Sequence, residues 1–254
     1  MKDFSFKAKI RLYIKSNLII KQKLIVETKQ SHYLLNVMRK KVNDTIFVFN
    51  ELQGEFEAEI ITVNKKKITI EILHKLRSPE KVNDIWVIFA PVKKNATDLI
   101  IQKSTELGVS KIIPILTERT IARRVNLKRM EEIAIEASEQ SERVTIPEIS
   151  PIHTLHEIIS SWSSNRKVFY GDETIRNNLD ELGNQNKLVR GSSGAILIGP
   201  EGGFSSEEIN FLKTKKFVIP INFGPRVLRS DTAVICGLVC WHMINGDMRN
   251  YQVK

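Results

Sequence analysis

Four charged residues stand in two glycine- and proline-containing turns near the end of the chain: Glu201 in the first turn, and Arg226, Arg229 and Asp231 in the second. Each turn follows an apolar run short enough for a buried strand, and each leads into a helix-like segment. Glycine lets the backbone approach a ligand closely, and proline holds a turn rigid. Two such turns lying side by side would wall a small-molecule pocket and supply it with charges of both signs.

The first turn, Gly199-Pro200-Glu201-Gly202-Gly203, does not match the common phosphate-binding loops. No Gly-Lys-Ser/Thr follows it, as a Walker loop requires, and its glycines lack the GxGxxG spacing of a dinucleotide fingerprint. The spacing of these residues alone is compatible both with a structural turn and with a ligand site. The second turn favours a site, because Arg229 and Asp231 directly precede a very apolar helix and are expected to be partly buried there.

Composition indicates a globular, basic protein. The 254 residues, 42% of them hydrophobic, suffice for one large domain or two smaller ones. The net charge is +10, and residues 1–80 hold 16 Lys and Arg against 9 Asp and Glu. This excess predicts a polyanion-facing N-terminal region, because Lys and Arg neutralise the phosphates of nucleic acids. Solvated lysines without a partner are the alternative interpretation.

The sequence gives no sign of a membrane segment or a metal site. It has no run of eighteen apolar residues, and its first residues lack the apolar core of a secretory signal, so we expect a cytoplasmic protein. The two cysteines, Cys236 and Cys240, lack the spacing of a zinc site and are interpreted as core thiols.

Up to about residue 75, short β-branched runs alternate with polar residues, which predicts a small antiparallel barrel. One helix is expected at residues 31–39, with Ser31 as its N-cap and Arg39, Lys40 and Lys41 at its C-terminal end. Residues 77–81 are expected to be a linker. The predicted strands are residues 9–14, 45–49, 56–63 and 67–73.

From residue 84 the pattern changes to strand, helix, strand, helix, which predicts an α/β domain with a mostly parallel sheet. Ser205 and Glu208 form a capping box, and the last helix is apolar nearly all round, so it should pack on two sides. The predicted strands are residues 85–90, 112–116, 167–170, 194–198 and 217–221. The predicted helices are residues 96–107, 127–143, 205–213 and 231–244, and residues 160–164 and 184–193 are expected to be loops.

Four sequence blocks in order, at residues 99–109, 137–143, 198–204 and 224–233, resemble the signature blocks of the RsmE family. These proteins are 16S ribosomal RNA uridine-N3 methyltransferases of the SPOUT class. The resemblance covers nearly the whole chain, including residues 32–39. It departs from the family pattern at Ser230-Asp231-Thr232, where the family usually has Thr-Glu-Thr.

The resemblance implies a PUA-like β-barrel at residues 1–75, followed at residues 82–254 by a SPOUT domain with a C-terminal trefoil knot. It also implies S-adenosyl-L-methionine as the methyl donor, 16S ribosomal RNA of the 30S subunit as the partner, and a homodimer without metal. The residues it implies for the cofactor are Gly171, Ile198, Gly199, Pro200, Gly202, Gly203, Asn222, Phe223, Gly224, Val227, Leu228, Thr232 and Ala233.

Methylation at N3 of uridine requires an unstacked base whose ring N–H has been deprotonated. We expect Arg229 to stabilise negative charge on the base carbonyls or to bind a neighbouring phosphate. Glu201 or Asp231 would orient or remove the proton. The alternative for Arg229 and Asp231 is a structural ion pair.

For RNA binding we expect basic residues of the N-terminal region and of the loop after residue 116, although a merely solvated loop is the alternative. Glu106, Glu139, Gln140 and Arg143 match the family blocks and are expected to position RNA or the second subunit; surface helix pairs are the alternative. Rival functions are another SPOUT methyltransferase, acting on tRNA or a ribose 2'-hydroxyl, and a non-catalytic RNA-binding assembly factor. The RNA-binding candidates are Arg11, Arg39, Lys40, Lys41, Arg119, Arg123 and Arg124.

Overall fold

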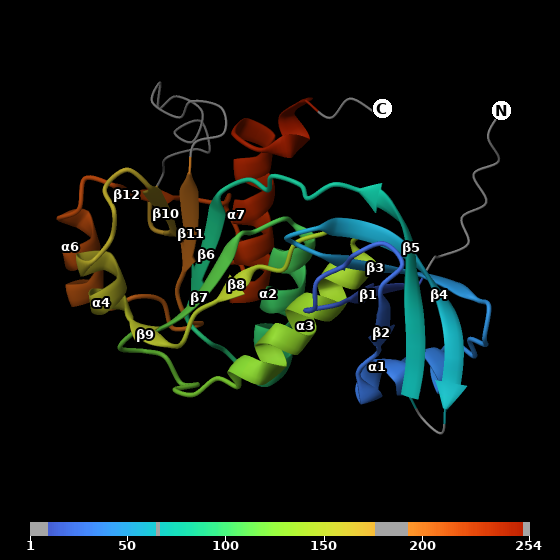
Figure 1. Cartoon of the computed structure of the whole chain (residues 1–254). Helices are drawn as coiled ribbons and strands as arrows, with labels where there is room; N and C mark the ends of the chain where they lie inside the picture. The colour runs from blue at the N-terminus through green and yellow to red at the C-terminus, as the bar shows by residue number, and fades with distance from the viewer. Residues whose placement is uncertain (1–9, 65–66, 176–192, 251–254) are drawn as a thin grey trace. The chain divides into compact units, whose positions relative to one another are not determined.

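The computed structural model describes residues 10–64, 67–175 and 193–250, and it divides into two compact units (Figure 1). The first contains residues 1–81 together with residues 138–146, and the second contains residues 82–137 and 147–254. Helix α3 therefore begins in the second unit and ends in the first. Most of the expected loop at residues 184–193 lies outside the described residues.

The N-terminal unit is built on a five-stranded sheet with the strand order β1-β3-β4-β5-β2. The prediction of an antiparallel arrangement is wrong in one place, because β1 pairs with β3 in parallel, whereas the other neighbours are antiparallel. Alternating apolar residues of this sheet, such as Ile46, Val48, Ile60 and Ile70, form its core. Its elements are β1 (Arg11–Tyr13), β2 (Lys23–Ile25), α1 (Thr28–His32), η1 (Tyr33–Val37), β3 (Thr45–Asn50), β4 (Gly54–Asn64) and β5 (Lys67–Arg77).

The helix of this unit begins three residues earlier than predicted, and Ser31 is not its N-cap. Ser31 lies inside α1, fully buried, where its hydroxyl donates to the carbonyl of Val26 at 3.1 Å and accepts from the amide of Ile68 at 3.3 Å. The N-cap position is Glu27. A buried serine thus bonds the helix to the strands beneath it, and local sequence alone does not separate this role from a cap.

Two further differences concern the strands. Strand β2 was not predicted, because it is an exposed edge strand of three residues with little apolar alternation. The expected linker at residues 77–81 begins one residue too early, since Arg77 is the last residue of β5. The side chain of Arg77 bonds to Glu55 at 2.8 Å and to the carbonyl of Glu142 at 2.7 Å.

Arg11 lies at the centre of this unit, not on its surface. Only 7% of it is exposed, and its guanidinium forms an ion pair with Glu55 at 2.5 Å. It also donates to the carbonyls of Ser138 at 2.9 Å, Glu139 at 3.0 Å and Arg143 at 3.1 Å, where α3 (Leu127–Gln140) ends. Burial and these bonds occupy the guanidinium, so Arg11 is corrected from an RNA contact to a residue that caps a helix C-terminus.

The family-block residues next to Arg11 are structural as well. Glu139 accepts from the amide of Tyr13 at 2.9 Å. Burial lowers the pKa of Arg143 to about 10, and its guanidinium donates to the hydroxyl of Thr145. Glu106 belongs to the second unit, where it forms the i,i+3 pair with Lys103 that the alternative interpretation had anticipated. These contacts fix the three side chains within the chain, and their positioning of RNA or of a second subunit stays a prediction.

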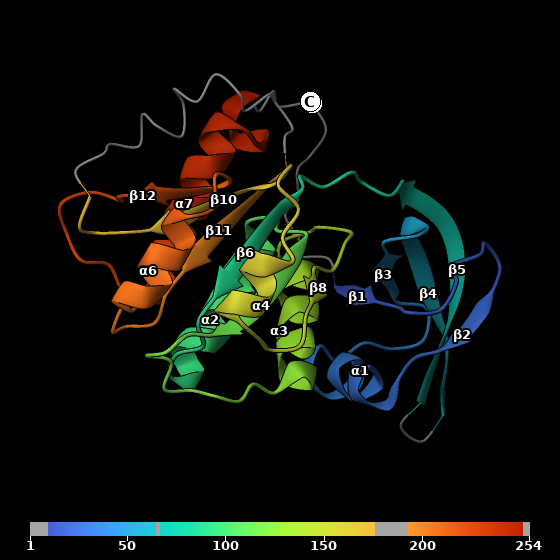
Figure 2. The same cartoon turned by 90° about the vertical axis from the view of Figure 1, so that its left-hand side faces the viewer.

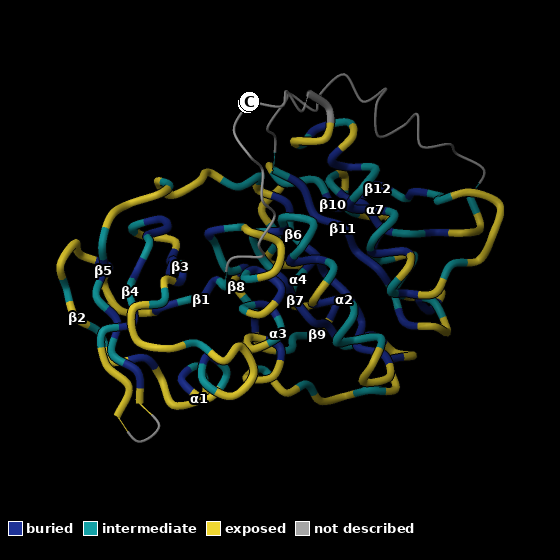
Figure 3. The backbone as a smooth tube through the Cα atoms, turned by 90° about the vertical axis from the view of Figure 1, so that its right-hand side faces the viewer, coloured by how far each residue is buried: buried dark blue, intermediate teal, exposed yellow. Residues whose placement is uncertain are grey.

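The C-terminal unit has the predicted parallel sheet, with the strand order β12-β10-β11-β6-β7-β8 and β9 beside β7. Its central strands are near-continuous apolar runs, as strands covered on both faces require. Figure 3 shows these strands as buried and the loops around them as mostly exposed. The strands are β6 (Ile85–Phe89), β7 (Lys111–Leu116), β8 (Glu148–Ile149), β9 (His153–Thr154), β10 (Lys167–Gly171), β11 (Gly194–Ile198) and β12 (Val218–Ile221).

Helices cover both faces of this sheet. Helices α4 and α6 pack on one face, and α2 and α7 lie against the other (Figures 1 and 2). The capping box of Ser205 and Glu208 is confirmed, whereas α4, with a capping box of Thr154 and Glu157, was not predicted. The helix expected at residues 127–143 ends earlier, at Gln140. The helices of this unit are α2 (Lys94–Glu106), α4 (Leu155–Ser160), α6 (Ser206–Lys213), α7 (Ser230–Ile244) and the 3-10 turn η2 (Asp247–Asn250).

A glycine explains how α7 approaches the sheet so closely. A Cβ atom on Gly237 would lie 2.9 Å from Cγ2 of Ile196 on β11 and 3.2 Å from the ring of Phe223. Glycine is unfavourable inside a helix, so its presence here indicates a packing requirement. The middle of α7 is thereby held against β11, the strand that leads into the first of the two turns.

Candidate functional site

A cavity of about 280 Å³ opens at the carboxyl ends of three neighbouring strands, β12, β10 and β11. It is lined by the loops that follow these strands, by the first residues of α7 and by Arg119 from the loop after β7. In open parallel sheets the carboxyl edge is the usual place for a ligand. The two glycine-proline turns singled out from the sequence therefore line one cavity, together with a third loop between them.

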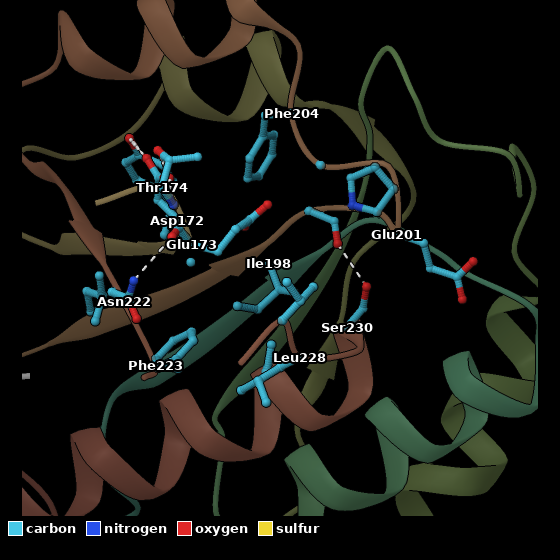
Figure 4. A pocket seen from close by; sticks show the side chains of 18 of the residues that line it. Asp172, Glu173, Thr174, Ile198, Glu201, Phe204, Asn222, Phe223, Leu228 and Ser230 are labelled. Atoms are coloured by element: carbon cyan, nitrogen blue, oxygen red, sulfur yellow. Dashed lines mark hydrogen bonds between the residues drawn. The ribbon is translucent and has the colours of Figure 1, made fainter. Parts of the chain in front are cut away.

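The turn after β11 is fixed by contacts with the residues that follow it and with the start of α7. The ring of Phe204 packs on Gly199, where a Cβ atom would lie 3.1 Å from the ring. Gly203 has a φ of +70° and donates its amide to the carbonyl of Pro200 at 2.8 Å. The hydroxyl of Ser230, at the start of α7, donates to the carbonyl of Gly199 at 3.1 Å (Figure 4). These contacts fix the backbone of the turn at the cavity wall.

Asn222 connects the other two loops. Its side-chain amide donates to the carbonyls of Ile175 at 2.7 Å and Glu173 at 3.3 Å, while its oxygen accepts from the amide of Gly224 at 2.7 Å. Figure 4 shows the bond to Glu173 crossing between the two loops. Both amide hydrogens are thus used within the protein. The Asn222 side chain shapes the cavity, and its backbone remains to face a ligand.

Asp172 is the buried carboxylate of the cavity wall, with 7% of the residue exposed. Its Oδ1 accepts from the amide of Thr174 at 2.9 Å and from the hydroxyl of Thr174 at 2.6 Å. Its Oδ2 lies 3.3 Å from the hydroxyl of Tyr170. Burial, then the charge of Asp172 and the hydrogen bond to it, raise the pKa of Tyr170 to about 12, so the phenol stays protonated and donates.

The loop after β7 is attached to the turn after β11. Arg119 donates to the carbonyl of Gly202 at 2.8 Å, and the amide of Glu118 donates to Glu208 at 2.8 Å. Arg119 is exposed and lines the cavity, whereas Arg123 and Arg124 are exposed further along the same loop. The structure therefore places one of the three arginines at the cavity and two beyond it.

Most of the predicted cofactor residues line this cavity, and Glu201 stands at its rim with its carboxylate turned outward (Figure 4). Arg229, Asp231 and Thr232 are not among the lining residues. The expected burial of Arg229 is wrong, because this residue is exposed at the N-cap position of α7, whereas Asp231 is partly buried as expected. The predicted residues that line the cavity are Gly171, Ile198, Gly199, Pro200, Gly202, Gly203, Asn222, Phe223, Gly224, Val227, Leu228 and Ala233.

Asp231 makes local contacts. Its Oδ1 accepts from the amide of Thr232 at 2.7 Å and from the hydroxyl of Thr232 at 3.2 Å. Within residues 10–64, 67–175 and 193–250, no ion pair joins it to Arg229. The alternative of a bracing Arg229–Asp231 pair is therefore not what this structure contains.

Sequence reasoning missed several lining residues, and Asp172 is the most important of them. The available signal was its position directly after an apolar strand, at the same sheet edge as the two turns. Arg226, named from the sequence as a charge of the second turn, does line the cavity. The residues missed are Tyr170, Asp172, Glu173, Thr174, Phe204, Ile209, Ile221 and Ser230.

Neither a metal site nor a membrane span is found in the part of the chain that the structure describes. Among the described residues, no group of three or more His, Cys, Asp or Glu side chains could hold a metal ion. In that same part of the chain, every helix is too short or too polar to cross a membrane.

The sequence matches two family models. An RNA methyltransferase domain matches residues 78–242, and an RNA methyltransferase PUA domain matches residues 26–73. Among curated proteins, ribosomal RNA small subunit methyltransferase E of Buchnera aphidicola subsp. Schizaphis graminum is 34% identical, over 94% of this chain and 97% of its own length. The protein of the same name from Rickettsia conorii is 32% identical, over 90% of this chain and 93% of its own.

Solved structures agree with this match. Ribosomal RNA small subunit methyltransferase E of Neisseria gonorrhoeae, bound to S-adenosyl methionine, superposes with a TM-score of 0.82 at 26% identity, covering 92% of this chain and 97% of its own. A methyltransferase of Legionella pneumophila in complex with the same cofactor gives 0.83 at 28% identity, with the same coverage. The chain belongs to the ribosomal RNA small subunit methyltransferase E family, the RsmE family that its sequence blocks resemble.

Proposed function

We propose that this protein transfers a methyl group from S-adenosyl-L-methionine to N3 of one uridine in the 16S ribosomal RNA of the small subunit. The observation that carries the proposal is the cavity at the carboxyl ends of β10, β11 and β12, in a domain whose relatives of known structure hold this cofactor. Both family models also match in the expected order along the chain.

The residues around the cavity fit the cofactor. Apolar side chains of Ile198, Phe223 and Leu228 provide a wall for an adenine ring, and the three loops present backbone donors and acceptors beside it. A Cβ atom on Gly171 would lie 3.1 Å from the Phe223 ring and 3.2 Å from Ile198, so glycine keeps the space between these walls open. When bound, the cofactor supplies an electrophilic methyl group on a positively charged sulfur.

The residues that act on the base stand outside the buried part of the cavity. We propose that Arg229 stabilises the negative charge that develops on the uridine carbonyl oxygens once N3 loses its proton. Glu201, at the rim, and Asp231, on the first turn of α7, are the candidates for orienting or accepting that proton. Arg229 and Glu201 are exposed and Asp231 is partly exposed, which suits groups that complete a site only when an extruded base covers them.

RNA contacts are proposed on two basic surfaces. Arg119, Arg123 and Arg124 lie on the exposed loop after β7, next to the cavity. Arg39 and Lys41 are exposed and Lys40 is partly exposed, directly after η1 in the N-terminal unit. We propose that residues 1–75 form the RNA-binding PUA-like domain and residues 82–254 the methyltransferase domain, with phosphate contacts positioning the substrate.

The pairing of two copies of the chain is a further part of the proposal. One side of α7 packs in the chain, while Ile235, Cys236, Val239 and Cys240 on its other side are only partly covered and Met243 is 60% exposed. We propose that this second apolar side pairs with a second copy of the chain. A barrel closure of the N-terminal sheet, a C-terminal trefoil knot and a cytoplasmic location complete the proposal.

The test is methyl transfer to defined RNAs. Purified protein with labelled cofactor is offered 30S particles from cells that lack it, free 16S RNA, and tRNA. We expect labelling of ribosomal RNA and a single stop of reverse transcription, because a methyl group on N3 blocks base pairing. Labelling of tRNA, or of a ribose without such a stop, would contradict the proposal.

The role of Arg229 is tested in the same assay. Arg229→Ala is expected to retain cofactor binding and to lower the transfer rate about 100-fold, the usual scale for one lost electrostatic stabiliser. Lys216→Ala, which removes an exposed cation away from the cavity, is the matched control. If Arg229→Ala transfers methyl groups as fast as Lys216→Ala, the assignment is wrong.

A further inference from the structure

The charged residues that line the cavity differ in their exposure to water. Glu173, Glu201, Arg119 and Arg226 are exposed, so water and salt screen their charges. Asp172 is the buried member of this set. Because a charge acts over a longer range in a medium of low dielectric constant, we expect Asp172 to contribute more to the field inside the cavity than the other charged lining residues that the structure describes.

The hydrogen bonds of Asp172 determine which cation it suits. A carboxylate offers about four acceptor positions. Three of them are used by the amide and hydroxyl of Thr174 and the hydroxyl of Tyr170. The group therefore has little remaining capacity to accept hydrogen bonds. Both an ammonium and a sulfonium are attracted by the charge. The N–H donors of an ammonium would find few free acceptor positions here, whereas a sulfonium has no N–H or O–H donor and needs none.

We propose that Asp172 is the counter-charge to the sulfonium of the bound methyl donor and makes the site prefer the donor over its thioether product. This inference rests on the proposed function, because it takes S-adenosyl-L-methionine as the ligand of this cavity. The donor carries one more positive charge than S-adenosyl-L-homocysteine and otherwise differs from it only by a methyl group. A carboxylate beside the sulfur is thus a direct means of telling them apart.

The proposal also has a kinetic consequence. When the methyl group leaves, its bonding electron pair stays on sulfur, and the positive charge at sulfur disappears. The attraction to Asp172 is therefore stronger before transfer than during it. Such an interaction lowers KM without raising kcat. Loss of the carboxylate should act mainly on donor affinity.

The experiment is calorimetric titration of the full-length protein and its Asp172→Asn variant with three ligands. These are the donor, the thioether product, and an unreactive analogue with a protonated amine in place of the sulfonium. We expect Asp172→Asn to weaken binding of both cationic ligands about 10-fold or more and of the product less than about 3-fold. The KM for the donor should rise, whereas kcat should not fall.

Two further variants separate charge from structure. Asp172→Glu keeps the charge and should restore most of the donor preference, whereas Glu173→Gln makes the same charge change on the exposed neighbour and should alter it less than about 3-fold. Thermal melts check that every variant is folded. Equal loss of donor and product in Asp172→Asn overturns the inference and indicates an ammonium contact or a purely structural carboxylate. Failure of the unaltered protein to bind any of the ligands overturns the proposed function instead.

Discussion

Arg11 in the N-terminal unit and Arg119 in the C-terminal unit both donate to backbone carbonyls, but their surroundings differ. Arg11 is buried, paired with Glu55 and bonded to three carbonyls where α3 ends. Arg119 is exposed and bonded to the carbonyl of Gly202, and its other N–H groups have no acceptor among the described residues. A guanidinium whose donors are all used stabilises the fold, whereas one with free donors beside a cavity can bind an anion.

The same contrast separates the two regions. In the N-terminal unit, the buried charges of Arg11 and Glu55 compensate each other, so they contribute to architecture. At the cavity, the loops are held mainly by neutral groups, the amide of Asn222 and the hydroxyl of Ser230, and the arginines remain exposed. Stability and function therefore depend on different kinds of side chain in the two units.

The largest expected effect is that of Arg11→Ala. It removes the buried partner of Glu55, which keeps only its contact with Arg77, and the donor to three carbonyls. We expect the N-terminal unit to lose about 3 kcal/mol of stability. Hydrogen exchange of peptides from β3 to β5 measures this loss. The three tryptophans, Trp86, Trp162 and Trp241, all belong to the other unit and report on it separately by fluorescence.

Arg39→Ala is the control for Arg11→Ala, because Arg39 is an exposed arginine of the same unit and should change stability by less than about 0.5 kcal/mol. Similar exchange rates in the two variants would show that the buried network is not what stabilises this unit, and the contrast with Arg119 would lose its basis.

The next effect is expected for Asn222→Ala. It removes two donors and one acceptor that hold the loops after β10 and β12 together, and should cost about 1–2 kcal/mol. Tryptophan fluorescence during urea unfolding measures it, and calorimetry should show at least a several-fold weaker binding of the methyl donor. Asn210→Ala, at an exposed position of α6, is the control. Unchanged donor affinity in Asn222→Ala would mean that the loops hold their positions without this residue.

A smaller effect is expected for Ser230→Ala, which removes a single hydrogen bond to the carbonyl of Gly199. We expect a loss of about 1 kcal/mol, the usual value for one neutral hydrogen bond. The same urea titration checks it, with Ser206→Ala at the exposed start of α6 for comparison. A loss as large as that of Arg11→Ala would contradict the view that neutral, replaceable bonds hold the cavity loops.

The smallest change in stability is expected for Arg119→Ala, within about 0.5 kcal/mol, because the residue is exposed. Its effect should appear in RNA binding. Losing one phosphate contact reduces the slope of log K against the logarithm of the salt concentration by about 1. Filter binding at several salt concentrations measures this. Lys128→Ala, an exposed cation of α3, should leave the slope nearer to that of the unaltered protein. An unchanged slope in Arg119→Ala would remove this residue from the RNA contacts.

Much of the C-terminal unit could be predicted because its signals are local. The apolar runs of β6 and β11, the capping box of Ser205 and Glu208, and the glycine that follows α2 each determine their element over a few residues. The two turns could be placed at one edge because carboxyl ends of parallel strands share an edge. Strand β2, by contrast, is an exposed edge strand whose pairing with β5 leaves little trace in its own residues.

The sequence by itself determined the order of strands and helices, the excess of basic residues near the N-terminus and the two turns that line the cavity. Only the tertiary structure decided which charged residues are buried. Arg11 and Arg229 are the same residue type, yet one is enclosed by the end of α3, more than a hundred residues away along the chain, and the other is exposed. Asp172 likewise gains its place in the cavity wall from strands on both sides of β10. The burial and electrostatic environment of these charged side chains depend on contacts between distant segments, and the residues next to them in sequence do not encode those contacts.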